Sequence, residues 1–240
     1  MSFKPIYRRV LLKISGESLA GAQRNGIDSD VLRAICVNIK RAADQGVQIG
    51  IVVGGGNYWR GRDMPHMERT RADHAGMLGT VMNGLAMTDC LISLGVDARL
   101  MTAIEMSAVA EFYTRNRAIA QLEAGCVIIF AAGTGNPYFT TDTTAALRAA
   151  EVGAQVVLLA KRIDGVYSDD PEKNPNAEFI PEITHLDMLN RQLGVMDATA
   201  ATFCLENGLP ILVFGIRDPN NILRAIAGER VGTAIRTPAQ

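Results

Sequence analysis

Turns rich in glycine follow three apolar segments of this chain, and such turns can bring backbone amides close to an anionic ligand. The segments are short and near-continuous in apolar character, as strands buried on both faces of a parallel sheet are. Because glycine has no Cβ, the N–H groups of these turns could point at phosphate oxygens. The alternative is that topology alone demands three tight turns. The turns are Ser15-Gly16-Glu17, Gly54-Gly55-Gly56-Asn57 and Gly133-Thr134-Gly135-Asn136.

Basic residues accompany these turns. Lys13 lies inside the first apolar segment, where a lysine is rarely buried unless it is paired, although it could also snorkel from a strand edge. Arg60 follows the triple-glycine turn and could bind phosphate oxygens in a bidentate manner. Lys161 and Arg162 follow another apolar segment, and the sequence does not decide which of them approaches the phosphates.

A further segment combines hydroxyl, amide and aromatic side chains directly before a predicted helix. Its last residue, Asp142, could cap the helix over 143–152. The functional alternative is an acidic group that holds Lys13 near a transferring phosphate. The segment consists of Thr134, Gly135, Asn136, Pro137, Tyr138, Phe139, Thr140, Thr141 and Asp142.

Two common nucleotide-binding motifs are excluded. A Walker A loop requires Gly-Lys before Ser or Thr, and the chain contains no Gly-Lys dipeptide. The dinucleotide fingerprint Gly-x-Gly-x-x-Gly fails because Trp59 and Tyr138 occupy the position of its last glycine in the two available frames. The four cysteines and three histidines are dispersed and show no zinc-site spacing.

The elements that must position these residues alternate along the chain. Apolar segments predict strands, and the intervening stretches predict helices, so we expect a three-layer αβα sandwich with a central, mostly parallel sheet in one domain, residues 1–240. The helix predicted over 75–94 is apolar around most of its circumference, which indicates a core position or a subunit contact. The stretch 164–184 is expected to be a long irregular loop with a binding role. The predicted strands are 10–14, 47–53, 98–101, 126–131, 155–160 and 211–214, and the other predicted helices are 28–45, 142–152 and 196–207.

Composition limits the partners. The formal net charge is −1, so the chain lacks the basic bias of proteins that bind nucleic acid through its phosphates. No apolar run is long enough for a signal peptide, and we expect neither a membrane association nor disulfides, in keeping with a cytoplasmic protein.

With these residues in view, the sequence resembles the amino-acid-kinase superfamily and, within it, the bacterial UMP kinases. The resemblance covers essentially the whole chain. It rests on six segments, of which the first is Leu-Leu-Lys-Ile-Ser-Gly-Glu and the last is Val-Met-Asp-Ala-Thr-Ala. The segments are 11–17, 54–61, 73–87, 133–142, 164–171 and 195–200.

The resemblance implies the reaction ATP + UMP → ADP + UDP with Mg²⁺ held mainly by ATP, as a step of pyrimidine nucleotide biosynthesis. It also implies a homo-oligomer, typically a hexamer, with GTP and UTP as possible allosteric ligands. Residues 1–150 would mainly bind UMP and form subunit contacts, and residues 151–240 would mainly bind ATP. The implied catalytic residues are Lys13, Asp142, Lys161 and Arg162. The implied ATP site consists of Lys13, Ser15, Gly16, Gly56, Arg60, Lys161, Tyr167 and Asp170. The implied UMP site consists of Gly55, Asp73 and Thr134 to Thr141.

Two other readings of the sequence stay open at this point. Another member of the superfamily could phosphorylate an amino acid or a carbamate, although such acceptors would need a different segment at 134–141. The chain could also be a catalytically silent nucleotide sensor, against which the presence of both Lys13 and Asp142 argues.

Overall fold

The computed structural model describes residues 4–23, 25–61, 64–171 and 173–237. Within this part of the chain, nine strands form one sheet in the order β4-β3-β5-β2-β1-β6-β10-β11-β9. Neighbouring strands are parallel except for β10 and β11, which are antiparallel. The strands are β1 (Arg9–Ile14), β2 (Gln48–Val53), β3 (Ala98–Thr102), β4 (Glu111–Phe112), β5 (Val127–Ala131), β6 (Val157–Lys161), β9 (Glu182–Thr184), β10 (Ile211–Gly215) and β11 (Gly232–Arg236).

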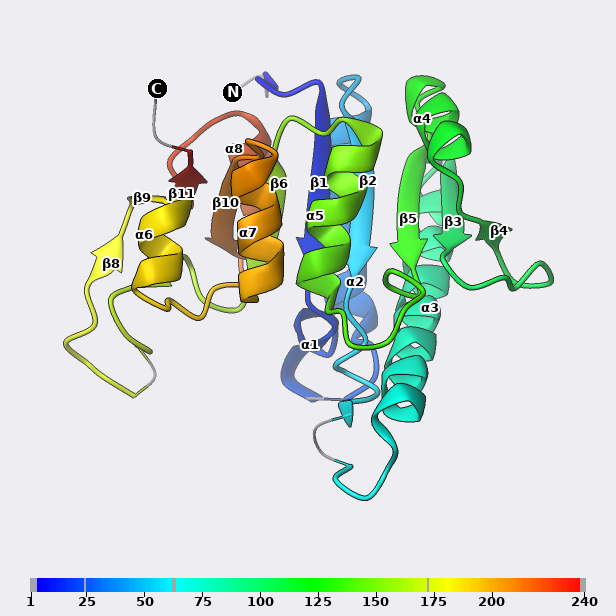
Figure 1. Ribbon diagram of the computed structural model, residues 1–240. Helices are drawn as coiled ribbons and strands as arrows, with labels where there is room; N and C mark the ends of the chain where they lie inside the picture. Colours follow the sequence, from blue (N-terminus) through cyan, green and yellow to red (C-terminus); the bar gives the residue numbers. More distant parts are fainter. Residues whose placement is uncertain (1–3, 24, 62–63, 172, 238–240) are drawn as a thin grey trace.

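Helices cover both faces of this sheet, so the predicted three-layer αβα architecture is confirmed (Figure 1). One face packs against α2, α3 and α8, and the other packs against α4, α5, α6 and α7. The helices are α1 (Gly16–Leu19), α2 (Ser29–Ala43), α3 (Arg69–Ser93), α4 (Arg115–Glu123), α5 (Thr141–Val152), α6 (His185–Asn190), α7 (Ala198–Glu206) and α8 (Asn221–Ile226), with a short 3₁₀ turn at Gly21–Gln23.

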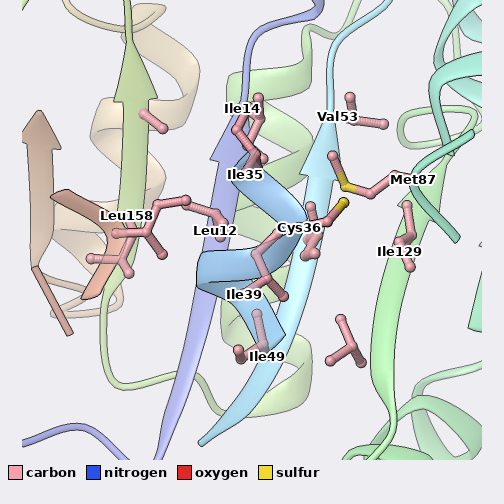
Figure 2. Close-up of a cluster of buried hydrophobic side chains, with 14 of the residues drawn as sticks. Leu12, Ile14, Ile35, Cys36, Ile39, Ile49, Val53, Met87, Ile129 and Leu158 are labelled. Atoms are coloured by element: carbon pink, nitrogen blue, oxygen red, sulfur yellow. The ribbon is translucent and has the colours of Figure 1, made fainter. Parts of the chain in front are cut away.

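The central strands are buried on both faces, which is why their sequences are apolar without alternation. In β1, Leu12 and Ile14 face α2, whereas Leu11 belongs to the core on the opposite face. Figure 2 shows α2 packing on β1 and β2 through an apolar stripe with helical spacing. That stripe consists of Leu32, Ile35, Cys36 and Ile39, and the carboxylate of Asp28 caps the helix by accepting from the N–H groups of Asp30 and Val31.

One sheet joins the two parts of the chain that were expected to bind different substrates, residues 1–150 and residues 151–240. Strand β1 pairs with β2 on one side and with β6 on the other, so residues from 1–150 and from 151–240 share one hydrogen-bonded ladder. Side chains at the carboxyl ends of β1 and β6 are therefore held in fixed register.

Two predictions about local structure are wrong. The stretch 164–184 is not irregular, because β9 lies within it and β7 (Val166–Tyr167) pairs with β8 (Phe179–Ile180) in a second, two-stranded sheet. Helix α3 begins at Arg69 rather than at 75, because the carboxylate of Glu68 accepts from the N–H groups of Thr70 and Arg71 and caps it there.

Helix α3 combines a buried and an exposed apolar face. Met77, Val81 and Met87 are buried against the sheet, while Leu78 and Met82 are 50% and 49% exposed. In the described chain, α3 is the one helix with the length and mean hydropathy of a membrane span, and 44% of its most apolar window is buried. Helix α3 packs on β3 and β5, and core helices can also have the length and mean hydropathy of a membrane span.

Candidate functional site

The turns predicted to bind phosphate lie at one edge of the sheet. Strands β1, β2 and β5 are adjacent and parallel, so their carboxyl ends and the glycine-rich turns that follow them lie side by side (Figure 1). Strand β6 ends at the same edge and places Lys161 there. The three turns and Lys161 therefore share one edge of the sheet.

A carboxylate between two lysines lies at the centre of this edge. Lys13, near the end of β1, is only 6% exposed, and its Nζ lies 2.7 Å from Oδ1 of Asp142. The Nζ of Lys161 lies 4.0 Å from Oδ2 of the same carboxylate and donates to the carbonyl oxygen of Val195. Arg162, the other candidate from the sequence, is exposed. Lys161, the last residue of β6, is therefore the one placed in this cluster, and not Arg162, which follows the strand.

The charges of this cluster stabilise one another. Burial alone would raise the pKa of Asp142, but Lys13 and then Lys161 hold that pKa below its ordinary value, so the carboxylate is ionised at neutral pH. Burial lowers the pKa of Lys161 below its ordinary value, while the charge of Asp142 opposes that shift. The protein thus holds two ammonium groups in a largely desolvated position by placing a carboxylate between them.

Asp142 does not cap the helix that carries it, so that interpretation of the sequence is wrong. The cap of α5 is Thr140, whose Oγ1 accepts from the N–H groups of Asp142 at 3.0 Å and Thr143 at 3.2 Å. Asp142 lies in the first turn instead. From there its carboxylate is free to pair with Lys13.

Part of the glycine pattern is explained by packing between backbones. A Cβ on Gly16 would lie 2.6 Å from the carbonyl oxygen of Gly54, and a Cβ on Gly55 would lie 2.5 Å from that of Gly76 in α3. Real Cβ atoms do not approach so closely, so both glycines allow turns and helix to touch. At Gly56 the closest atom would be Oε1 of Glu17 at 3.4 Å, so this glycine faces more open space.

A cavity of about 430 Å³ lies beside the cluster, between the turns after β2 and β5 and the amino-terminal parts of α3 and α5. Arg60 lines it, and its guanidinium forms an ion pair with Glu17. The residues predicted for the UMP site that line this cavity are Gly55, Asp73, Phe139, Thr140 and Thr141, and those predicted for the ATP site are Gly56 and Arg60.

Asp73 joins α3 to the segment between β5 and α5. Its Oδ2 accepts from the N–H of Tyr138 at 2.8 Å and pairs with Nε of Arg69 at 2.8 Å. The Arg69 guanidinium also lies over the Tyr138 ring, 5.2 Å from its centroid. Residues 65 positions apart are thereby brought to one rim of the cavity.

Other residues predicted for the site lie near this edge but outside the described lining of the cavity. Thr134, Gly135, Asn136 and Pro137 precede Tyr138 in the same turn, where a Cβ on Gly135 would lie 2.9 Å from the carbonyl oxygen of Ala103. Ser15 caps the short helix α1 by accepting from the N–H of Ser18.

Tyr167 and Asp170 lie in the segment after β6, which Figure 1 shows towards β8, on the opposite side of the sheet centre from α3. The Tyr167 hydroxyl donates to Asp164 at 2.7 Å, and Asp170 pairs with Lys173 at 3.0 Å. The structure does not bring either residue to the lining of the cavity described above.

Sequence reasoning missed two groups that support this edge. The side chains of Asn57 and Asn83 are buried and exchange hydrogen bonds of 2.9 and 2.7 Å, and Asn83 also donates to the carbonyl oxygen of Gly54. Asp197, directly before α7, accepts from Thr140 and Thr143. The only signal for these residues was their presence inside the segments 54–61, 73–87 and 195–200.

Comparison with known proteins assigns the chain to one family. The sequence model described as the amino acid kinase family matches residues 8–215. The chain belongs to the amino acid kinase family. Lys13, Asp142 and Lys161 all lie within the matched region.

Solved structures resemble the chain over nearly its whole length. A UMP kinase from Bacillus anthracis has a TM-score of 0.93 and 37% identity, covering 98% of each chain. A UMP kinase from Ureaplasma parvum has a TM-score of 0.91 and 38% identity, covering 96% of this chain and 99% of its own. A uridylate kinase from Archaeoglobus fulgidus is more distant, with a TM-score of 0.73 and 26% identity over 94% of this chain and 99% of its own.

Proposed function

We infer that the protein transfers the γ-phosphoryl group of ATP to UMP, which gives ADP and UDP. The observation that carries this inference is the 37–38% identity to two UMP kinases over 96–98% of the chain. The Lys13–Asp142–Lys161 cluster at the carboxyl edge of the sheet supplies the electrostatic features that such a transfer needs.

Phosphoryl transfer requires positioning and neutralisation of charge more than covalent chemistry by the protein. A phosphate oxygen of UMP attacks the γ-phosphorus, and the bond to the β-phosphate oxygen breaks. Since that attacking oxygen is already ionised near neutral pH, no side chain has to remove a proton. The ammonium groups of Lys13 and Lys161 would stabilise the charge on the transferring group, and Asp142 would hold both in place.

The two substrates are assigned to neighbouring parts of the edge. We propose that Ser15, Gly16, Gly56 and Arg60 surround the ATP phosphates, for which Arg60 would exchange its partner Glu17. The acceptor would occupy the cavity lined by Gly55, Asp73 and Phe139 to Thr141, with the rest of the segment Thr134–Thr141 beside it. Lys161, Tyr167 and Asp170 would contact the nucleoside of ATP, so that residues 1–150 mainly bind UMP and residues 151–240 mainly bind ATP.

We propose Mg²⁺ as the divalent metal of this reaction. Among the described residues, no group of three or more His, Cys, Asp or Glu side chains could hold an ion. Mg²⁺ commonly binds through substrate phosphates and water, so it is proposed to enter as MgATP and to neutralise phosphate charge there.

We also propose a homo-oligomer, a hexamer by analogy with the family, in the cytoplasm and within pyrimidine nucleotide biosynthesis. The support is the exposed apolar face of α3, where Leu78, Met82, Leu85 and Ile92 are 43–53% exposed. An apolar face of this kind is usually covered by another subunit. GTP and UTP are proposed as allosteric ligands on the strength of the family resemblance alone.

A coupled assay with ATP and UMP tests the proposed function directly. We expect turnover with UMP well above that with CMP or dCMP, and a dependence on Mg²⁺. GTP and UTP added to the same assay test the regulatory proposal. A catalytically silent sensor would bind nucleotide without forming ADP, and a kinase for another acceptor would leave UMP unphosphorylated.

A further inference from the structure

Asp197 belongs to the same polar network as the lysine–carboxylate cluster, although it lies 55 residues away from Asp142 in the sequence. It precedes α7 and caps it, because its Oδ1 accepts from the N–H of Ala200 at 2.9 Å. The same carboxylate accepts from the hydroxyl of Thr140 and, at 3.1–3.2 Å, from that of Thr143. One side chain thus joins the start of α7 to the start of α5.

The contact with Asp197 determines how the Thr140 hydroxyl is used. Its hydrogen is donated to Asp197, and its oxygen accepts from the N–H groups of Asp142 and Thr143. A hydroxyl has one hydrogen to donate and two lone pairs to accept with. Thr140 is therefore fully occupied within the protein, and its hydroxyl fixes the first turn of α5 although it lines the cavity.

Asp197 also acts on the charged groups themselves. Burial is the largest effect on the pKa of Asp142 and raises it. The two lysines lower that pKa, and the backbone N–H of Asp197 lowers it to a smaller extent. The negative charge of Asp197 also opposes the effect of burial on Lys161, as the charge of Asp142 does more strongly. Two carboxylates and two ammonium groups, Lys13 and Lys161, make the cluster formally neutral.

We propose that Asp197 is a positioning residue for phosphoryl transfer, which holds the first turn of α5 through Thr140 and Thr143 and balances the charge of Lys161. The proposal rests on the proposed function for its kinetic consequences. Asp197 touches no reacting atom here and acts through Thr140, Asp142 and Lys161.

Asp197→Asn tests this proposal because asparagine can still cap α7. With the amide oxygen kept at the α7 cap, the amide nitrogen would face the Thr140 hydroxyl oxygen, which already accepts two hydrogen bonds, so Thr140 would lose the acceptor for its hydrogen. We expect kcat to fall by about tenfold or more, with the KM for ATP changed by less than about threefold. The matched control is Asp28→Asn, which alters the cap carboxylate of α2 without touching the cluster, and its kcat should stay at the wild-type value.

Thr140 variants test the path of the effect. Thr140→Val should lower kcat as much as Asp197→Asn, while Thr140→Ser, which keeps the hydroxyl, should restore most of it. Because the two residues act as a unit, the double variant should be no worse than the more damaging single variant. Losses that multiply, or a folded Asp197→Asn enzyme with kcat within about twofold of the wild type, would overturn the proposal.

The alkaline side of the pH profile gives a readout that helix capping alone would not move. The charged or titratable groups that act on Lys161 are Asp142 from α5, Lys13 from β1 and Asp197. Cys204 of α7 also faces the two carboxylates, and its pKa is raised to about 12, by burial first, so it stays neutral. Without the charge of Asp197 the pKa of Lys161 should fall further. The loss of kcat on the alkaline side should therefore begin at a lower pH in Asp197→Asn than in the wild type, and should not shift in Asp28→Asn.

Labelling of Lys161 by an amine-reactive reagent, followed by peptide mass spectrometry across pH 7–10, measures the same shift without turnover. Faster labelling at a given pH in Asp197→Asn supports the proposal, and an unchanged labelling curve overturns it. If the wild-type protein failed to phosphorylate UMP, the proposed function would fall, and labelling would still decide whether Asp197 balances Lys161.

Discussion

The pairing of one buried carboxylate with two lysines predicts an unusual order of stabilities among charge-removing variants. Asp142 lies 2.7 Å from Lys13 and 4.0 Å from Lys161. Removing one partner of a buried pair generally destabilises a protein by about 3–5 kcal/mol, because the other charge stays buried without compensation. In Lys13→Met, however, Asp142 keeps Lys161, and charges about 4 Å apart at an effective dielectric constant near 20 attract by about 4 kcal/mol.

We therefore expect Lys13→Met to lose about 2–3 kcal/mol, at or below the lower end of that range. Asp142→Asn removes the charge between two ammonium groups, and we expect a loss of about 4 kcal/mol or more. The double variant Lys13→Met/Asp142→Asn should be more stable than Asp142→Asn alone, because it removes the Lys13 ammonium group that Asp142→Asn leaves without its carboxylate partner. All three variants should lose roughly 10²-fold or more in kcat, as enzymes do when one preorganised electrostatic group is removed.

Urea unfolding followed by circular dichroism at pH 7 and fixed protein concentration measures these stabilities. At pH 7 the contribution of Asp142 is complete. Its pKa is lowered in the folded protein by Lys13 and Lys161 against the effect of burial, so the contribution disappears only as pH falls below the unfolded value of 3.8. The control is Arg224→Met, which breaks an exposed 2.8 Å pair with Glu229 and should cost less than about 1 kcal/mol. A double variant less stable than Asp142→Asn, or losses that simply add, would refute the reasoning.

Three further predictions concern the cavity and the fold. Gly55→Ala should lower the free energy of unfolding in the same urea experiment by about 1–3 kcal/mol, since its Cβ would lie 2.5 Å from a carbonyl oxygen of α3. The control Gly194→Ala, whose Cβ would have no atom within 4 Å, should change the free energy of unfolding by less than about 0.5 kcal/mol. Asp73→Asn should raise the KM for UMP more than the KM for ATP in steady-state assays, because Asp73 holds the Tyr138 amide at the cavity rim; equal increases would contradict its assignment. Burial lowers the pKa of His185 in the folded protein, so the unfolded chain binds the extra proton and stability should decline as pH falls below 6.5. His185→Gln should show a weaker decline in the urea midpoint between pH 8 and pH 5, and an unchanged slope would exclude His185 as the cause.

The central strands could be predicted because their burial on both faces makes their sequences continuously apolar. Short elements at the periphery carry no such signal. Helix α4 buries only Ala118 and Leu122 among nine mostly polar residues, and β7 and β8 are two residues each. Elements this short or this polar have no continuous or periodic apolar pattern, so the local sequence could not reveal them.

The candidate site divides in the same way. Lys13 could be singled out because a lysine inside an apolar strand needs a partner, and Asp142 was a candidate partner as the acidic end of the hydroxyl-rich segment before a predicted helix. The choice between Lys161 and Arg162 depends on which side chain β6 turns towards α5, and one-residue register is not visible in a sequence. Asp197 could not be found because its hydroxyl partners lie 54 and 57 residues away.

A balance of charges in the free protein explains why the site can hold one buried and one half-buried ammonium group before any substrate arrives. The formal charges of Lys13, Lys161, Asp142 and Asp197 cancel, and the Asp197 carboxylate is also held in position by a backbone N–H and two hydroxyls. A triphosphate that binds beside this cluster therefore meets ammonium groups that are already oriented and whose charge is balanced by the two carboxylates. Because α5 and α7 carry the two carboxylates, the lysine ammonium groups can interact with the phosphates without a large rearrangement of the protein. Such preorganised charges favour the transfer of a charged group.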